Sequence, residues 1–588
     1  MFVNRDPYQR RIQKKTILLA VFLLAWFLVI VGRLVDLQVI HHSELKAEVI
    51  KHNSDKTEII PKRGGIFDRN GTSLAVSLPV FSVAYVPFKG ETPKKHLVQI
   101  NLLKKVLSLM DKDVQRILSR IEARDSFVWI KRKVSDEEYE KVKRLNLPEV
   151  SFREENKRFY PFGPLAAHVL GGVGMDDKGL SGVEQKYDEL LKGVNGESLI
   201  LQDALKRKYQ IEVLKQPQPG ENLVLTIDQT IQHITERELR RAIDETQASW
   251  GTVVISHPAS GEILALANCP GYDPNLYPNI DREADINRAV RYNFEPGSTF
   301  KIVTVSAALE LGSWRPAEIF DCREGKIRIG NWTIRDHEKM GLLTFPEVFI
   351  HSSNVGTIKI SQNLPQDRFY NMIQAFGFGK KTEIGLPGEE NGIFHPVVKW
   401  TSVSLPSISI GYGISVTAVQ VLQALNVIAN RGILVPPRII QQKPGSVPRP
   451  GTASGPALRI ISERTAAEVT EILERAVVDG TGKEAVIEGF PVAGKTGTAQ
   501  KLDPELHVYT EKKHLSAFAG YVPADKPVLS MIVILDDPKG TLYYGGQVAA
   551  PLFRDIARSV LLYLREPPRS EFLTKAVVVT QNQIQRTP

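Results

Sequence analysis

An uncharged run from Thr16 to Gly32, near the N-terminus, limits where the rest of this chain can lie. A membrane-spanning helix needs about 20 mostly apolar residues, and residues 16–37 provide them if the long Arg33 side chain extends to the interface. A cleaved signal peptide is the alternative, but it usually has a shorter apolar core followed by a small-residue cleavage site. We therefore predict a transmembrane anchor over residues 16–37.

The charges beside this run predict its orientation. Four basic residues lie between positions 10 and 15, and positively charged flanks stay in the cytoplasm. Residues 1–15 are then a cytoplasmic basic tail, and everything after about residue 40 lies outside the cytoplasmic membrane. The sequence contains no second long apolar run, which predicts a single-pass protein.

Length and composition narrow the class of protein further. The chain has 588 residues, too many for one hydrophobic core, so two or three folded regions are expected. Its net charge of +9 is modest for this length. Lys and Arg are spread along the chain without a long basic block, and we therefore predict no binding to nucleic acid.

The chain contains two cysteines, Cys269 and Cys322, and neither a C-x-x-C nor an H-E-x-x-H pattern. Zinc sites need ligands in tighter patterns, so we predict neither a metal nor a cofactor. The two thiols could form a disulfide outside the cytoplasm. They could also be two buried thiols, the more common state of free cysteine.

Two regions follow the anchor. Residues 38–215 are rich in charge, with helix-like runs at 97–110 and 136–147, and the segment 215–222 ("KQPQPGEN") is typical of a linker. Residues 222–565 open with a strand and a helix capped by Asp228, followed by a hairpin-like pair of apolar runs over 250–268. Strand-like runs recur at 490–500, 514–523 and 527–537, and helix-like runs lie between. This order predicts an α+β domain, outside which we place a Pro/Gly-rich loop at 443–456 and a tail at 566–588.

Ser298 and Lys301 stand at the start of an apolar, helix-like run. Residues three apart share one face of a helix, so the hydroxyl and the amine would be neighbours. A buried lysine has a lowered pKa and can act as a base, and a helix N-terminus offers N–H groups to a developing oxyanion. The spacing alone is weak evidence, because Ser43 and Lys46 have it too and Ser298 could simply be a helix N-cap.

Two further short motifs follow this serine in chain order, one in a turn and one in a strand-like run. They are Ser352-Ser353-Asn354 and Lys495-Thr496-Gly497-Thr498. Gly497 would let a peptide lie close to the strand backbone. The patterns S-x-x-K, S-D-N and K-T-G occur together in the penicillin-binding and β-lactamase superfamily. Their conjunction predicts a serine acyl-transfer site, although each pattern is weak by itself.

With these motifs the chain resembles a class B penicillin-binding protein, a D,D-transpeptidase that cross-links peptidoglycan. Similar to the family's N-terminal pedestal, or dimerisation-type, domain are "RGGIFDRNGTSLA", "RFYPFGPLAAHVLG" and "GLSGVEQKYDELLKGVNG". Similar to its transpeptidase domain are "FEPGSTFK", "SSNVG", "GYGISVTAVQ", "DGTGKEA", "GKTGTAQ" and "YYGGQVAAPLF". The resemblance implies a single transmembrane helix, an elongated pedestal over residues 38–215, and a β-lactamase-like domain over 222–565, in which helices flank an antiparallel sheet.

The resemblance also implies a role for each motif residue. Ser298 would attack the carbonyl between the last two D-alanines of a stem peptide and form an acyl-enzyme with loss of D-Ala, while Lys301 acts as its base. Ser352 would pass a proton to the leaving amine. Asn354 would hydrogen-bond the substrate amide and the lysine, and Lys495 would supply positive charge near the Ser352 hydroxyl.

The strand motif is implied to bind the substrate. Thr496 and Thr498 would hold the terminal carboxylate, and Gly497 would leave room for the peptide. The backbone N–H groups of Ser298 and Thr498 would form the oxyanion hole. An amine from a second stem peptide would then resolve the acyl-enzyme; the sequence leaves the identity of that amine open. β-Lactams would mimic the donor and leave the serine acylated.

Two segments are most similar to the division-specific, or septal, branch of the family, "LAVSLPVFSVAYVP" and "DDPKGTLYYGGQVAAPLF". This implies cell-wall synthesis at the division septum, together with a membrane glycosyltransferase of the shape, elongation, division and sporulation family and with other division proteins. The alternatives are an elongation-specific transpeptidase, a β-lactamase, and a non-catalytic penicillin-binding scaffold or sensor. A β-lactamase would need a water-activating group for deacylation, which the sequence does not assign.

Overall fold

The computed structural model of the protein describes residues 7–45, 54–88, 92–123, 125, 127–202, 208–312, 314–330, 332–441, 457–502 and 509–569. The chain forms two compact units. One comprises Met1–Lys62 and Gly193–Pro219, and the other comprises Arg63–Lys192 and Gly220–Pro588. The predicted loop at 443–456 and most of the predicted tail at 566–588 lie outside the described residues.

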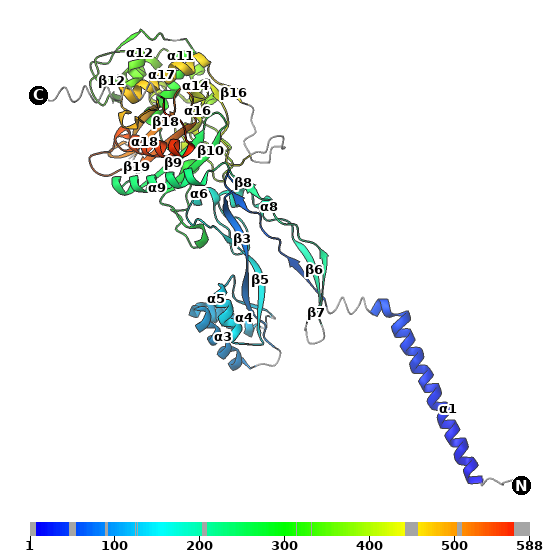
Figure 1. Ribbon diagram of the computed structural model, residues 1–588. Coiled ribbons are helices and arrows are strands. Elements are labelled where there is room, and N and C mark those ends of the chain that lie inside the picture. The colour runs from blue at the N-terminus through cyan, green and yellow to red at the C-terminus, as the bar shows by residue number, and fades with distance from the viewer. Residues whose placement is uncertain are drawn as a thin grey trace. The chain divides into compact units, whose positions relative to one another are not determined.

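The first unit begins with a long apolar helix. Helix α1 (Pro7–Val35) continues into a π-helical turn, η1 (Asp36–Ile40), and Figure 1 shows α1 in blue. The segment Arg11–Ile40 is long and apolar enough to cross a membrane, and none of its apolar window is buried inside the protein. The predicted anchor, residues 16–37, lies within this segment.

A three-stranded antiparallel sheet completes the first unit. Its strands, in the order β1-β6-β7, are β1 (Ser54–Ile59), β6 (Gly196–Gln202) and β7 (Lys208–Lys215). The predicted linker at 215–222 begins at the last residue of β7, and its Gln218 pairs with Val194. The first part of the predicted linker is therefore fixed by backbone pairing.

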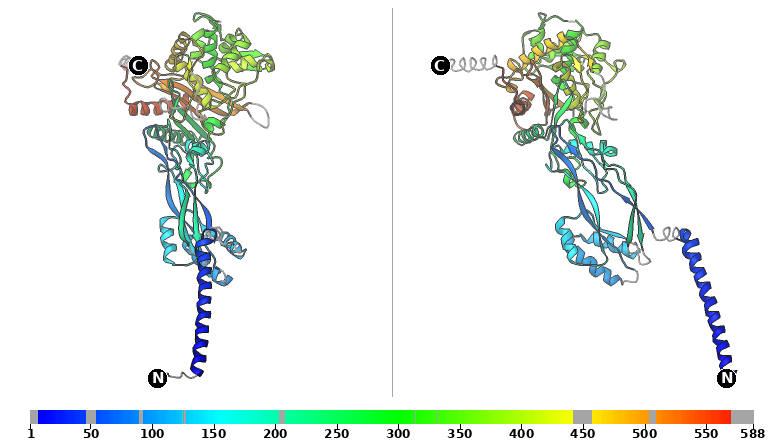
Figure 2. Two further views of the ribbon diagram at one scale, coloured as in Figure 1. Left: turned by 90° about the vertical axis from the view of Figure 1, so that its right-hand side faces the viewer. Right: turned by 45° about the vertical axis from the view of Figure 1, so that its right-hand side comes forward.

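The second unit starts with another sheet. The long strand β3 pairs with β4, β5 and β2, and β2 pairs in parallel with β8. The strands are β2 (Ile66–Phe67), β3 (Ser73–Tyr85), β4 (Val128–Lys131), β5 (Val150–Phe159) and β8 (Leu223–Val224). At one end lie α3 (Pro93–Leu107), α4 (Asp111–Glu122) and α5 (Asp136–Arg144), in dark to light blue in Figure 2. Their apolar faces meet this sheet in a core that includes Ile100, Ile117 and Val128.

A buried ion cluster joins three segments of this sheet region. Glu184 is fully buried and accepts hydrogen bonds from Arg63 (2.7 Å) and Arg158 (2.6 Å), and Arg63 also donates to Asp188 (2.6 Å). The three short helices beside it are α6 (Ala167–Leu170), α7 (Gly182–Lys186) and α8 (Asp188–Leu191). Because each buried charge has an opposite partner, the cluster fixes these segments relative to one another.

The C-terminal half of the chain is built on a five-stranded antiparallel sheet. Its strands, in the order β10-β9-β19-β18-β17, are β10 (Glu262–Cys269), β9 (Trp250–His257), β19 (Leu529–Asp536), β18 (Tyr509–Val522) and β17 (Ala493–Leu502). Every residue of β19 is buried, so both faces of the sheet are covered. The expected hairpin and the three expected strands near the C-terminus are confirmed, and so is the antiparallel sheet flanked by helices.

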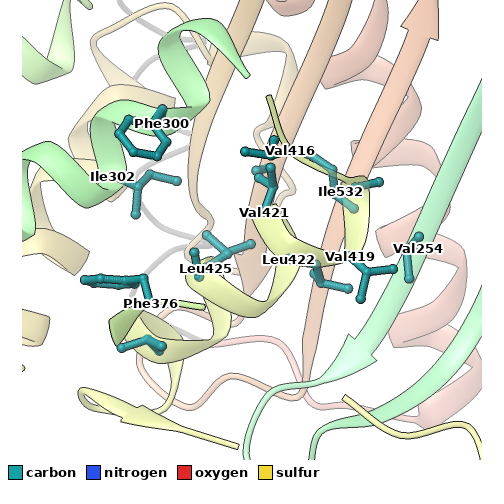
Figure 3. Packing of buried hydrophobic residues seen from close by; sticks show 14 of the residues in the cluster. Val254, Phe300, Ile302, Phe376, Val416, Val419, Val421, Leu422, Leu425 and Ile532 are labelled. Carbon is teal, nitrogen blue, oxygen red and sulfur yellow. The ribbon is translucent and has the colours of Figure 1, made fainter. Parts of the chain in front are cut away.

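Helices cover the two faces of this sheet (Figure 1). One face packs against α9 (Gln229–Thr246) and α18 (Gly545–Leu564), and Asp228 caps α9 as predicted. The other packs against a helical layer that includes α11 (Lys301–Glu310), α16 (Ala418–Ala429) and α17 (Glu463–Val478). Figure 3 shows Val254 and Ile532 of the sheet beside Val419 of the buried helix α16.

The remaining elements complete the helical layer and its edges. They are η2 (Pro274–Leu276), α10 (Arg288–Arg291), η3 (Gly297–Phe300), β11 (Ile319–Asp321), β12 (Lys326–Ile329), β13 (Trp332–Arg335), β14 (Leu342–Thr344), α12 (Phe345–Ile350), α13 (Asn354–Ser361), α14 (Gln366–Ala375), η4 (Val397–Lys399), α15 (Ser404–Ser409), β15 (Ile433–Leu434), β16 (Leu458–Arg459) and η5 (Lys483–Ala485). Both cysteines are free thiols; Cys322 is buried and Cys269 is half-buried.

Candidate active site

Ser298 lies in the short 3-10 helix η3, which runs directly into α11. Pro296 occupies the N-cap position, and its carbonyl accepts the Thr299 hydroxyl at 2.7 Å. Ser298 is therefore the second residue of a tight helical turn rather than its cap, which excludes the plain N-cap interpretation. Ser298 itself is half-buried, and the helix that follows it is buried.

The glycine-rich turn that contains Gly411 and Gly413 contacts the backbone beside this serine. The Gly297 N–H donates to the carbonyl of Gly411 (3.1 Å), and the Gly413 N–H donates to the Glu295 carboxylate (2.8 Å). Gly411 has a φ of +84°, and a Cβ added there would lie 2.1 Å from the Gly297 carbonyl oxygen. The two backbones thus touch where a side chain could not fit.

Lys301 begins α11 and is only 1 % exposed. Its ammonium donates to the Ser352 carbonyl (2.7 Å) and to Asn354 Oδ1 (2.8 Å), and it lies 3.3 Å from Ser352 Oγ. Burial lowers the pKa of Lys301 to about 7, although the nearby Asp336 carboxylate raises it in part. A large fraction of the amine is therefore neutral near neutral pH, as a general base must be.

The second motif forms the turn between α12 and α13. Ser352 has a φ of +61°, a conformation that is uncommon for a residue with a side chain and that concentrates at functional sites. Ser353 is the N-cap of α13, where its Oγ accepts the Gly356 N–H at 2.9 Å. The structure thus brings the first and second motifs together through the bonds that Lys301 makes.

The third motif lies on β17, the edge strand of the sheet. A Cβ added at Gly497 would lie 2.8 Å from Thr299 Cγ2, so this strand packs directly against the serine turn. Thr496 Oγ1 hydrogen-bonds Thr481 (2.6 Å), and Thr498 Oγ1 accepts the Gly545 N–H (2.9 Å). Gly497 therefore allows the strand to approach the serine turn closely, whereas the sequence led us to expect it to leave room for a substrate peptide.

Lys495 is the second buried amine of the site, with 2 % of its surface exposed. Burial lowers its pKa well below the usual range, and the positive charge of Lys301 lowers it further. Among the residues that the structure describes, the Lys495 ammonium donates to the Thr496 carbonyl (3.4 Å) and not to Ser352. Of the two buried amines, Lys301 is the one that contacts the Ser352 hydroxyl.

Two family profiles match the chain. The penicillin binding protein transpeptidase domain matches residues 251–558, and the penicillin-binding protein dimerisation domain matches residues 58–225. The chain belongs to the class B penicillin-binding proteins.

Known proteins are similar to this penicillin-binding protein over most of their length. It is 34 % identical over 575 residues to stage V sporulation protein D of Bacillus subtilis, and the match covers 96 % of this chain and 88 % of that protein. It is 32 % identical over 542 residues to the peptidoglycan D,D-transpeptidase FtsI of Escherichia coli, covering 92 % and 90 %. The crystal structure of penicillin binding protein 3 from Mycobacterium tuberculosis with aztreonam superposes with a TM-score of 0.67 at 29 % identity, covering 88 % and 99 %.

Sequence reasoning about this penicillin-binding protein missed several residues that surround the motifs. Asp336 contacts the second motif, Glu295 binds the glycine-rich turn, and Tyr509 donates to both oxygens of Glu295 (3.0 and 2.9 Å). Thr481 lies in "DGTGKEA", a segment that carried the family resemblance, but its contact with Thr496 has no signature in the spacing. These contacts join segments far apart in the chain, which a local pattern cannot show.

Proposed function

We propose that this penicillin-binding protein is a peptidoglycan D,D-transpeptidase that works through an acyl-enzyme on Ser298. The observation that carries the proposal is the buried Lys301 amine, which lies one helical turn after the serine, has a pKa of about 7 and is bound to the second motif. Relatives named as peptidoglycan D,D-transpeptidases, and related structures solved with aztreonam and ampicillin, support the same reaction class.

In the first half-reaction, neutral Lys301 takes the Ser298 proton as the hydroxyl oxygen attacks the carbonyl between the two terminal D-alanines. The Ser298 and Thr498 N–H groups face the oxyanion that forms. The C–N bond then breaks, and the leaving D-Ala amine receives a proton through Ser352, whose Oγ lies 3.3 Å from the lysine nitrogen. The ester to Ser298 remains, and D-Ala departs.

In the second half-reaction, the amine of another stem peptide attacks this ester. The same lysine accepts the amine proton and returns a proton to the serine oxygen, so the new amide forms and the enzyme is restored. Asn354 orients the substrate amide, and Thr496 and Thr498 bind the terminal carboxylate beside Gly497. The negative charge of that carboxylate favours the protonated form of Lys495. A β-lactam enters the first half-reaction in place of the donor and leaves the serine acylated.

Fluorescent penicillin tests the chemistry on the full chain in detergent. Covalent, long-lived labelling should occur and should be lost in Ser298→Ala. Ser43→Ala is the matched control, because Ser43 opens the other S-x-x-K pattern and should not affect labelling. Rapid release of the label would instead indicate a β-lactamase, and a folded protein that takes up no label would indicate a scaffold. Release of D-Ala from a stem pentapeptide, with a cross-linked product when an amine acceptor is added, would establish transpeptidation.

We infer a place for this reaction at the division septum. The support is the similarity to FtsI and PenA proteins, while the similarity to a sporulation protein keeps a sporulation role as the competing possibility. The apolar helix anchors the chain in the cytoplasmic membrane with its N-terminus inside, where a membrane glycosyltransferase of the shape, elongation, division and sporulation family and other division proteins can contact it. Replacing residues 16–32 by an unrelated span should keep penicillin labelling and abolish division; retained division would contradict this partnership.

A further inference from the structure

Asp336 directly follows β13 and contacts the second motif, although no sequence pattern links the two. Its carboxylate accepts hydrogen bonds from the Ser353 hydroxyl (2.9 Å), the Asn354 N–H and the Val355 N–H (3.0 Å). The preceding carbonyl, of Arg335, accepts the Asn354 side-chain amide at 2.9 Å. Two consecutive residues at the end of one strand therefore hold both the backbone and the side chain of Asn354.

These contacts lead directly to the catalytic lysine. Because the Nδ2 of Asn354 is bound to Arg335, its Oδ1 is turned toward Lys301, which donates to it at 2.8 Å. Lys301 also donates to the carbonyl of Ser352, whose uncommon backbone conformation immediately precedes the segment that Asp336 binds. These two acceptors of the ammonium thus depend on the turn that Asp336 holds.

The middle residue of the second motif has no charge in this chain, so a carboxylate at this place has to come from another segment. The superfamily pattern S-D-N carries an aspartate at that position. Here the position is Ser353, and its hydroxyl donates to Asp336. In proteins with S-D-N the negative charge lies inside the motif. In this chain Asp336, at the end of the β12–β13 hairpin, supplies it.

We propose that Asp336 is a positioning residue for acyl transfer, which holds Asn354 and the Ser352 carbonyl in place as acceptors of the Lys301 ammonium and contributes the negative charge that Ser353 lacks. The proposal rests on the proposed roles of Ser298 and Lys301. The competing explanation is that Asp336 only caps the N-terminus of α13, where a carboxylate is favourable in any helix. A readout that follows the charge of the lysine separates the two.

That readout is the pH dependence of acylation. The charged groups that face Lys301 are Asp336, which raises its pKa, and Lys495 and His337, whose own pKa values are lowered by burial and further by the positive charge of Lys301. Removing the negative charge of Asp336 removes an attraction that favours the charged form of Lys301. The pKa of Lys301 then falls, so its neutral form persists to lower pH and the acidic limb of the acylation profile shifts in the same direction.

The experiment measures the second-order rate of penicillin acylation against pH for the full chain in detergent. Asp336→Asn has the same shape, can keep both backbone contacts through its Oδ1, and loses the charge. We expect its acidic limb to move to lower pH, with less than about a tenfold loss at high pH. Asp336→Ala loses the contacts as well and should lose about a hundredfold, as expected when a reacting group is displaced by about 1 Å. Glu338→Gln removes an exposed charge on the same segment and should leave the profile unchanged.

The double variant Asp336→Asn with Ser353→Asp returns a carboxylate to the motif and should move the acidic limb back toward that of the wild type. An unshifted limb in a folded Asp336→Asn protein, or a wild-type rate in Asp336→Ala, would overturn the proposal and leave a helix cap. Failure of the proposed function would look different, because the wild-type protein itself would then carry no label on Ser298.

Discussion

Replacing Gly411 by alanine should disable the nucleophile without unfolding the protein. The new Cβ would lie 2.1 Å from the Gly297 carbonyl oxygen, and real Cβ contacts are essentially never shorter than 3.0 Å, so the Gly411 backbone and the serine turn must separate by about 0.9 Å. A displacement of this size at a reacting group costs about a hundredfold in rate. The positive φ adds about 1–2 kcal/mol to the cost of folding, because alanine is strained there.

Gly413 provides the matched control for this variant. It lies in the same turn with a φ of +70°, but a Cβ added there meets nothing within 4 Å. Gly413→Ala should therefore lose only the stability that its positive φ costs and keep its acylation rate. The assay is fluorescent-penicillin labelling over time, with denaturant unfolding of both variants. Equal acylation rates in the two folded variants would refute the argument that the contact with Gly297 positions Ser298.

The acylation rate of the wild-type protein should rise with pH through about 7, because burial lowers the pKa of Lys301 to that value and only its neutral amine accepts the nucleophile's proton; a flat profile would contradict this base. Glu184→Gln should lower the free energy of unfolding by about 3–5 kcal/mol, because two buried guanidinium groups each lose an anionic partner. The control Glu189→Gln removes an exposed charge and should cost less than about 1 kcal/mol. Equal losses in denaturant titrations would argue against a stabilising cluster. Cys269 and Cys322 should both react with a thiol reagent in the denatured, non-reduced protein, and a mass that shows only one or neither modified would indicate a bridge.

The elements with strong local patterns were predicted well from the sequence. The β9–β10 hairpin and the strands β17, β18 and β19 coincide with apolar runs bounded by turn residues. Helix α9 begins directly after its N-cap Asp228, whose side chain accepts hydrogen bonds from the Thr230 and Ile231 N–H groups. The parallel pairing of β2 with β8 was not predicted, because these two-residue strands are defined by their partners and carry no periodicity of their own.

The candidate site was predicted from the order of three motifs, and its surroundings were not. Ser298 was expected at the start of a regular helix, but it lies in a 3-10 turn whose geometry depends on contacts with Gly411 and Gly497. Asp336 was not predicted, because its contact with Ser353 depends on where the β12–β13 hairpin lies in the folded protein. Such residues act through space, so a single sequence gives no signal for them.

The pairing of β2 with β8 also constrains the order in which the protein can fold. Ile66 lies beside Leu223, and Leu225 forms a bridge with Ile440, so residues early in the chain complete their backbone pairing only with partners made much later. Contacts of such long sequence separation form slowly, because the closure entropy of the intervening chain opposes them. A chain that emerges N-terminus first therefore leaves the strand edge near residue 66 without its parallel partner until β8 has been made, and an unpaired strand edge of this kind is prone to aggregation.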